Sequence, residues 1–416
     1  MIGPGVMEEY LQSLALNRER FLTFSTWFYD ASLVFVYCLP SSSPLENTSN
    51  LLHELAHAEL ANTPLGFLRQ TLFELSARLA DSLYQTRVLP VLREHAVKHF
   101  SSDERQPDAG LISGAPRTFA EQERTRKVAD QLYQHAHDDI VNSLFADVSR
   151  EQIELFLLLQ RRHKAIAEHS ILSHEAAATY WQLGDRPGLE SAYASAFGLL
   201  GKVFPASGEL GGLREFVRAK SQSLSGVWKE AFELAREIES RVGNEKAVML
   251  AAKLALHFDY RDCKLLDMPE AEFHGLTESI HLSADLRMKA LADMPIALKA
   301  ACESEGAEVS LLQATLRRPD GSSNSGANGS FSDWINQFVI GSNACRKAGI
   351  NFVAHKVPND DWCTQPLRAT PRLAPLVLPD GCIFAQSPKE AHDLRRDFVR
   401  SHRVRILDRV CNRMMQ

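Results

Sequence analysis

The sequence has few of the features that mark secreted or membrane-spanning proteins. Its seven cysteines are scattered and never spaced C-x-x-C, which argues against a disulfide framework or a cysteine zinc site. The longest apolar run, residues 31–39, falls far short of the roughly 20 residues that a membrane helix needs. The start of the chain carries Glu8 and Glu9 and no positively charged stretch before an apolar run, so no signal peptide is expected. These absences predict a cytoplasmic protein without a membrane partner.

Motifs for phosphate binding and for a serine nucleophile are also missing. The chain has no G-x-x-x-x-G-K-[ST] loop, no G-x-G-x-x-G after a predicted strand and no G-x-S-x-G elbow. A net charge of −6 argues against general nucleic-acid binding, because no domain-wide positive field is available. One exception is a predicted basic helix over residues 388–413, which is rich in arginine. Such a run is usually a solvated face, and nucleic-acid or anion binding is the alternative there.

A chain of 416 residues is too long for a single compact core, so two or three domains are expected. Linker-like stretches rich in Gly, Pro and Ser fall at residues 101–117 and 317–330. We therefore predict a mainly α protein with three parts. These are a small α+β domain over residues 1–105, a helical domain over residues 118–306 and a small mixed domain over residues 331–416. The oligomeric state is not indicated by the sequence.

Apolar periodicity predicts the individual elements. Aromatic and β-branched runs predict strands over residues 21–29 and 31–39, followed by a loop to residue 50. Ser49 or Asn50 is the expected cap of a helix that ends near residue 62, and a second helix follows. Further helices are predicted from their spacing at residues 119–145, 149–181, 188–203, 212–224, 227–242, 245–258, 284–304 and 333–347. A short strand is expected at 382–385.

The stretch Leu51-Leu-His-Glu-Leu-Ala-His-Ala-Glu-Leu60 carries the one pattern that names a chemistry. It reads as a helix with His-Glu-x-x-His, which places His53 and His57 one turn apart on one face. Hydrolytic zinc sites use three protein ligands and keep one position for water. His53 and His57 would supply two of these ligands, and Glu54 would act as general base toward the water. The alternative is an amphipathic helix whose histidines have no chemical role.

An aromatic strand region, a loop and this helix together resemble the active-site region of zincin metallopeptidases, in particular the intracellular ImmA/IrrE-like type. The resemblance covers roughly residues 20–85 and implies a zincin-like fold for the N-terminal domain. It also implies a third zinc ligand from a glutamate on the next helix, often followed three residues later by alanine. Glu74-Leu-Ser-Ala77 matches that pattern, whereas Arg78 stands where an acidic residue often follows.

Other residues are alternatives for this third ligand or for an outer role. Glu121 and Glu123 would replace Glu74 if the linker folds back, and Asp81 is a candidate for orienting an imidazole N–H. A different kind of metal site is suggested by two further clusters, which consist of His135, His137, Asp138 and Asp139, and of His163, Glu168, His169, His174 and Glu175. A helical di-metal site would need a second Glu-x-x-His, and Glu278 to His281 provides that spacing.

These patterns lead to one preferred hypothesis and two alternatives. The preferred one is a Zn²⁺-dependent peptidase that cleaves an intracellular protein or peptide substrate, with a regulatory role. Its ligands are His53, His57 and Glu74, and its catalytic base is Glu54. The alternatives are a non-enzymatic helical scaffold and a helical His/carboxylate oxidase or hydrolase.

Overall fold

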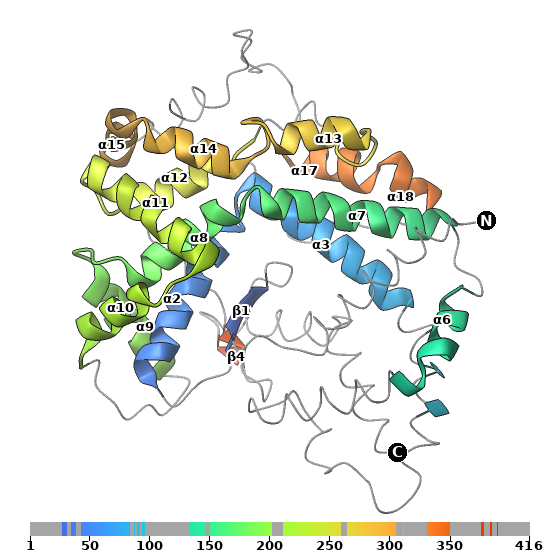
Figure 1. Ribbon diagram of the computed structural model, residues 1–416, viewed down its shortest axis with the longest axis horizontal. Helices are drawn as coiled ribbons and strands as arrows, with labels where there is room; N and C mark the ends of the chain where they lie inside the picture. The colour runs from blue at the N-terminus through green and yellow to red at the C-terminus, as the bar shows by residue number, and fades with distance from the viewer. Residues whose placement is uncertain are drawn as a thin grey trace, which may run out of the picture. The chain divides into compact units, whose positions relative to one another are not determined.

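The structure, a computed structural model, is mainly helical (Figure 1). The description covers residues 27–30, 35–38, 43–83, 134–145, 150–201, 211–258, 264–304 and 331–349, the pairs 376–377 and 383–384, and a few single positions between them. Among these residues, no helix combines the length and the apolarity that crossing a bilayer requires. The predicted basic helix at 388–413 lies outside the described residues, apart from position 389.

The contacts within the chain divide it into two compact units. The first contains residues 1–39, 72–161 and 375–416, and the second contains residues 40–71 and 162–374. Two long helices, α3 (Pro64–Leu83) and α7 (Arg150–Glu168), contribute residues to both units. The domain boundaries predicted near residues 105, 118 and 306 lie outside the described residues and stay predictions.

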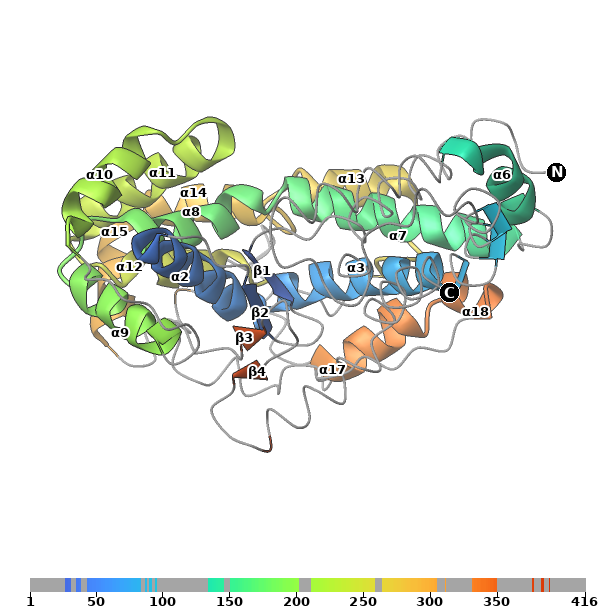
Figure 2. The same ribbon diagram turned by 90° about the horizontal axis from the view of Figure 1, so that it is seen from below.

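The first unit contains a small four-stranded sheet, in the order β1-β2-β3-β4, whose strands lie side by side in Figure 2. Strands β1 (Trp27–Asp30) and β2 (Phe35–Cys38) pair antiparallel. Strand β2 falls within its predicted range, whereas β1 runs one residue past the predicted end at 29. The short β3 (Leu376–Val377) pairs parallel to β2, and β4 (Ile383–Phe384) pairs antiparallel to β3. This unit also contains α6 (His137–Phe145).

Helix α2 (Pro44–Leu60), which carries the histidine motif, begins earlier than the sequence pattern suggested. Its N-cap is Ser43, whose hydroxyl accepts the Glu46 N–H at 3.3 Å, and Pro44 occupies the first helical position. A serine cap followed by proline is a favourable helix start, because proline has no N–H to leave unsatisfied there. The expected cap at Ser49 or Asn50 is therefore wrong, since both residues lie inside the helix.

The single long helix predicted over residues 149–181 is instead two helices, α7 and α8 (Ile171–Leu183), separated at Ser170. The hydroxyl of Ser170 donates to the Ile166 carbonyl at 2.7 Å, which satisfies an acceptor at the end of α7. The Asp285 carboxylate accepts the first N–H groups of α8, from Leu172 at 3.3 Å and Ser173 at 2.8 Å. A side chain distant in sequence therefore caps α8, and the sequence around Ser170 does not indicate this cap.

Helix α8 is the central helix of the second unit. It packs against α2, α10 (Leu213–Gln222), α11 (Gly226–Val242), α12 (Ala247–Ala255) and α14 (Ala284–Ala292). Every residue from Leu172 to Leu183 is buried except Glu175, which is intermediate. A helix surrounded on all sides is normally apolar throughout. A carboxylate on such a helix therefore needs a local partner.

The second unit contains further helices. Helix α12 is buried along its whole length, and the guanidinium of Arg287 donates to the Ala255 carbonyl at its end, at 2.7 Å. The helix predicted over residues 284–304 breaks at Met294, because Pro295 begins a new helix. The remaining elements are α9 (Leu189–Gly201), α13 (Glu270–Thr277), α15 (Pro295–Glu303), α17 (Phe331–Trp334), the π-helical turn η3 (Ile335–Ile340) and α18 (Asn343–Lys347).

Candidate metal centre

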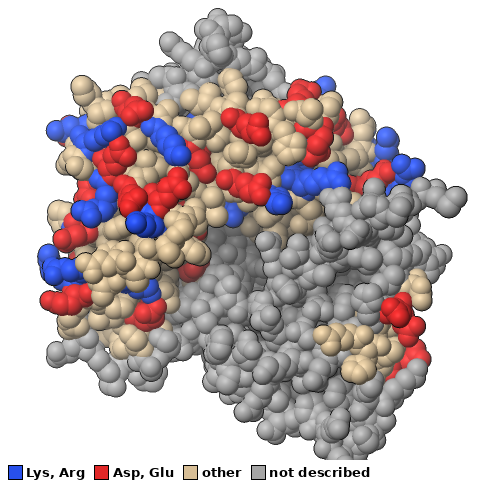
Figure 3. Space-filling model, in the orientation of Figure 1, with Lys and Arg blue, Asp and Glu red and all other residues tan. Residues whose placement is uncertain are grey.

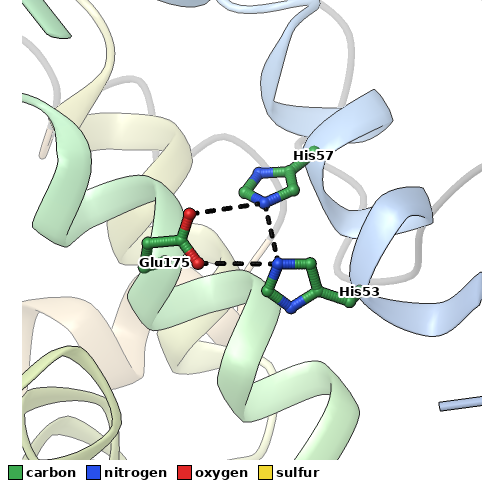
Figure 4. Close-up of side chains that lie close together, drawn as sticks. All are labelled: His53, His57 and Glu175. Atoms are coloured by element: carbon green, nitrogen blue, oxygen red, sulfur yellow. Dashed lines mark hydrogen bonds and ion pairs between the residues drawn. The ribbon is translucent and has the colours of Figure 1, made fainter. Parts of the chain in front are cut away.

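The two histidines of the motif lie in the middle of α2. Because residues four apart stand above one another on a helix, His53 and His57 project from the same face. Their Nε2 atoms lie 3.0 Å apart, and their ring planes meet at 80°. Both rings therefore turn the same nitrogen toward one point beside the helix, as Figure 4 shows.

The third member of the group comes from α8, which packs against α2. The carboxylate of Glu175 faces both imidazoles, with Oε2 at 3.5 Å from His53 Nε2 and Oε1 at 3.6 Å from His57 Nε2 (Figure 4). The side chains of His53, His57 and Glu175 are 17%, 21% and 16% exposed, respectively. Within the part of the chain that the structure describes, these three form the one His/Cys/Asp/Glu group compact enough to hold a metal ion.

The spacing of these atoms suits a small divalent ion. A tetrahedral zinc ion with bonds of about 2.0–2.1 Å keeps its ligand atoms about 3.3 Å from one another. The observed separations of 3.0, 3.5 and 3.6 Å lie on both sides of that value. Two imidazole nitrogens and one carboxylate are also donors that zinc accepts. The group could therefore hold a metal ion with little rearrangement, and its donor types do not by themselves select the metal.

Burial keeps both imidazoles in the form that binds metal. The pKa of His53 is lowered to about 4, mainly by loss of hydration and also by the neighbouring His57, while Glu175 opposes the shift. Burial also lowers the pKa of His57 to about 4, with a smaller contribution from Arg69. Metal coordination requires the neutral ring, so no proton has to be displaced from either histidine near pH 7.

The carboxylate of Glu175 experiences the opposite balance. Burial raises its pKa, while His53, the charge of Arg69 and the Trp228 side chain, which lies within hydrogen-bonding range, oppose the rise. Its Oε2 is buried and makes no hydrogen bond within the described part of the chain. A buried carboxylate oxygen without a hydrogen bond is unfavourable by itself. A cation between Glu175 and the two imidazoles would remove that penalty.

A second layer of polar groups lies around these three residues. Arg69, on α3, exerts its charge on His57, His174 and Glu175. His174, which precedes Glu175, is buried, and its ring centroid lies 6.1 Å from that of His57. Burial holds the pKa of His174 well below its usual value, so this ring is also neutral. The group of three ligands therefore has a third neutral imidazole and one guanidinium beside it.

Several residues predicted from the sequence are not placed by the structure. The Glu74 side chain lies outside the described residues although its backbone belongs to α3, and Glu121 and Glu123 are outside them entirely. The same holds for the Asp81 side chain. These assignments stay predictions. Glu54, the predicted base, follows His53 on α2 and is half-buried.

The other predicted clusters do not assemble into a group of three among the described residues. In the first of them, Asp139 Oδ2 lies 2.8 Å from His95 Nε2, within hydrogen-bonding distance, and the Asp139 side chain is 64% exposed. The spacing Glu278-x-x-His281 lies at the end of α13 and in the turn after it, so the two residues do not share a continuous helix. Glu175 was part of the second cluster, as a member of a different kind of site.

A signal for Glu175 was present in the sequence, although its partner was not. The segment Ile171-Leu-Ser-His-Glu-Ala-Ala-Ala-Thr-Tyr-Trp-Gln-Leu183 contains a single charged residue in an otherwise apolar and small-residue helix. Such a composition predicts a buried helix, and a lone carboxylate on a buried helix predicts a bound cation or an ion pair. That inference would have selected Glu175, but it would not have identified α2 as the facing helix.

The surface charge of the described residues is mixed. Figure 3 shows Lys and Arg interspersed with Asp and Glu over the described surface of this face. Several of these charges pair along one helix at a spacing of four residues, as Arg150 with Glu154 and Lys229 with Glu233 do. The predicted basic helix near the end of the chain lies outside the described residues, so nucleic-acid binding there stays a prediction.

Comparisons of the chain with models of known protein families, with curated proteins and with solved structures found no match. The functional argument therefore depends on the motif and on the geometry around it.

Proposed function

We propose that this protein is a Zn²⁺-dependent peptidase that hydrolyses a peptide bond in a protein substrate. The observation that carries the proposal is the meeting of Glu175 with the two histidines of the His-Glu-x-x-His helix. In this proposal His53, His57 and Glu175 hold the metal, and Glu175 takes the role for which the sequence suggested Glu74. Two imidazoles and one glutamate form a ligand set found in hydrolytic zinc enzymes.

The metal and the protein residues have separate tasks in this reaction. When bound, Zn²⁺ supplies Lewis acidity, which lowers the pKa of water to about 7 and polarises a carbonyl group. Glu54 accepts a proton from the attacking water as the new C–O bond forms. It then passes that proton to the amide nitrogen as the C–N bond breaks, which yields a carboxylic acid and an amine. Because the metal would occupy the Nε2 lone pairs of His53 and His57, Glu54 is left as the proton acceptor of the motif.

The charge of Arg69 supports the same reaction. Negative charge develops on the carbonyl oxygen as water adds to a peptide bond. A guanidinium whose charge already acts on His57 and Glu175 would stabilise that charge. Arg69 is therefore assigned an electrostatic role in the proposal.

The proposal keeps the zincin-like N-terminal region but changes its extent. The order of two strands and then the motif helix along residues 27–60 is the order that the resemblance implies. Glu175, however, comes from outside the predicted domain of residues 1–105, and α2 groups with residues 162–374. The helical unit would then be a necessary part of the metal centre. We further propose that the substrate is an intracellular regulatory protein, as the resemblance to ImmA/IrrE-like peptidases implies.

Metal analysis and a proteolysis assay together test this function. We expect the purified full-length chain to retain about one zinc per molecule, to lose it in His53→Ala and to keep it in His281→Ala, which removes an exposed histidine after α13. Casein and a quenched-fluorescent peptide library serve as substrates. Glu54→Gln should keep the zinc and lose cleavage, because only the base is removed.

Each alternative function gives a different result in the same experiment. A chain that binds no metal under any condition would favour the helical scaffold and contradict both metal hypotheses. Binding of two metal ions, one of them lost in His281→Ala, would favour the helical di-metal site. Cleavage that survives Glu54→Gln would contradict the proposed mechanism.

A further inference from the structure

Gln182 links the core of the second unit to the metal centre. It lies on α8 seven residues after Glu175, which is about two helical turns and so the same side of the helix. Its side-chain Nε2 donates to the Ser49 hydroxyl at 2.9 Å. Ser49 in turn stands four residues before His53 on the facing side of α2. Gln182 and Ser49 are 7% and 0% exposed, so water does not compete for this bond.

The position of Gln182 is fixed from its backbone as well. The hydroxyl of Tyr193, on α9, donates to the Gln182 carbonyl at 2.9 Å. Tyr193 is fully buried, and its side chain is also within hydrogen-bonding range of Ser49. The three residues therefore form a closed, buried set of contacts. A side chain held at both ends can orient a neighbour with little entropic cost.

His53 is the neighbour that needs such a partner. Its Nδ1 is buried and has no hydrogen-bond partner within the described part of the chain, and the Gln182 side chain lies close enough to the ring to oppose the fall in its pKa. Because Nε2 of Gln182 donates to Ser49, Oε1, the only acceptor of the amide, is left available to the ring. A neutral imidazole that donates from Nδ1 keeps a lone pair on Nε2. That is the nitrogen that faces His57 and Glu175.

We propose that Gln182 is a positioning residue that holds His53 in the Nδ1–H tautomer and so presents Nε2 as a metal ligand. Ser49 determines which end of the Gln182 amide faces the ring. The inference depends on the metal centre of the proposed function, but it does not depend on the peptidase reaction. Outer hydrogen bonds of this kind raise the basicity of a histidine ligand and restrict its rotation.

The first test is the tautomer of His53, read from the ring ¹⁵N chemical shifts of ¹⁵N-histidine-labelled protein at pH 7.5. His53→Gln assigns the signals. We expect the metal-free wild type to carry the proton on Nδ1, and we expect Gln182→Met to mix the two tautomers. Methionine keeps the length of the side chain and removes the amide oxygen. A wild-type His53 that carries its proton on Nε2 would overturn the proposal, whether or not zinc binds.

The second test is zinc affinity, measured by competition with a chromophoric chelator. Gln182→Met should weaken zinc binding about 10- to 100-fold, as loss of an outer partner of a histidine ligand does. Ser49→Ala should act in the same direction with a smaller effect, because Gln182 loses its orientation and keeps its acceptor. Gln160→Met is the matched control, since Gln160 also has a buried, unpartnered Nε2 but lies on α7. Equal zinc affinities for the Gln182→Met and Gln160→Met proteins would contradict the proposal.

Folding and function are separated by the design. Circular dichroism spectra and melting temperatures establish that each variant is folded, and Ser49→Ala carries both tests if Gln182→Met does not fold. If the wild type binds zinc but cleaves no substrate, the peptidase proposal is contradicted, and the proposal for Gln182 is unaffected. If the wild type cleaves substrate, and Gln182→Met has the same His53 tautomer and zinc affinity as the wild type, the positioning role of Gln182 is contradicted. The peptidase proposal then stands.

Discussion

Glu175 Oε2 lies 3.5 Å from His53 Nε2, and the two residues come from helices that are far apart in sequence. This contact joins the central helix of the second unit to the helix with the histidine motif. Burial makes the charged form of both side chains unfavourable, because it lowers the pKa of His53 and raises that of Glu175. Both shifts favour a bound cation as the partner of the carboxylate.

Removal of the Glu175 charge should abolish tight metal binding. In Glu175→Gln the amide oxygen is a weaker donor and carries no charge, so we expect zinc affinity to fall by more than about 100-fold, beyond the effect of an outer partner. Glu168→Gln is the control, because Glu168 is an exposed residue of α7 that pairs with Lys164. Isothermal titration of zinc into the metal-free proteins measures both values. Unchanged affinity in Glu175→Gln would direct attention back to Glu74 as the third ligand.

Zinc binding should persist in mildly acidic solution. Ordinary histidines with a pKa near 6.5 begin to compete with metal for protons below that pH. His53 and His57 have a pKa of about 4, so their competition begins only near that value. Protonation of Glu175, whose pKa is raised, is therefore expected to end binding first as the pH falls. Chelator competition from pH 7.5 to 5 should give an affinity that depends weakly on pH until that step.

The stability of the metal-free protein should fall as the pH is lowered from about 6.5 toward 4. His257 is buried beside the backbone of α12, and burial lowers its pKa to about 4. In that window the unfolded chain binds a proton that the folded chain does not, so each such histidine reduces the free energy of unfolding by about 1.4 kcal/mol per pH unit. Urea unfolding at several pH values measures the slope. The raised pKa of Glu175 acts with the opposite sign and reduces the total.

His257→Phe isolates one of these contributions. We expect its slope of unfolding free energy against pH to be smaller than that of the wild type by about 1.4 kcal/mol per pH unit between pH 6.5 and 4. His281→Phe, at an exposed position, should leave the slope unchanged. An equal slope in wild type and His257→Phe would mean that His257 is protonated in the folded state.

The ion pair between Lys253 and Glu59 should be essential to the second unit. The ammonium lies 2.5 Å from the carboxylate, and the two side chains are 4% and 8% exposed. Lys253→Met leaves a buried carboxylate without this ammonium, so we expect a loss of about 3–5 kcal/mol in unfolding free energy. The double variant Lys253→Met/Glu59→Gln should recover part of the loss. Lys229→Met, which removes an exposed pair with Glu233, should change stability by less than about 1 kcal/mol.

Trp228 should report the state of the metal centre. The residue is 50% exposed, and its side chain lies within hydrogen-bonding range of Glu175. Zinc that draws the carboxylate toward the imidazoles will change this contact, so we expect a change in tryptophan fluorescence on zinc addition. Trp228→Phe should lose that change, and Trp181→Phe should keep it, because Trp181 packs under Arg186. A signal that survives in Trp228→Phe would place the reporting tryptophan elsewhere.

The sequence by itself determined the histidine pair. A helix period places residues four apart on one face whatever surrounds them, so His53 and His57 had to point in one direction once the segment was helical. The mainly helical class followed in the same way from apolar periodicity over most of the middle of the chain.

Only the tertiary structure decided the third ligand and the helix breaks. Glu175 reaches the imidazoles because α8 packs on α2, and a packing partner is not encoded in local periodicity. Asp285 ends the predicted long helix by capping α8 from α14, which no window around Ser170 contains. Local rules fix the direction of a side chain on its own helix. Which helix faces it depends on how the whole set of apolar surfaces is buried together.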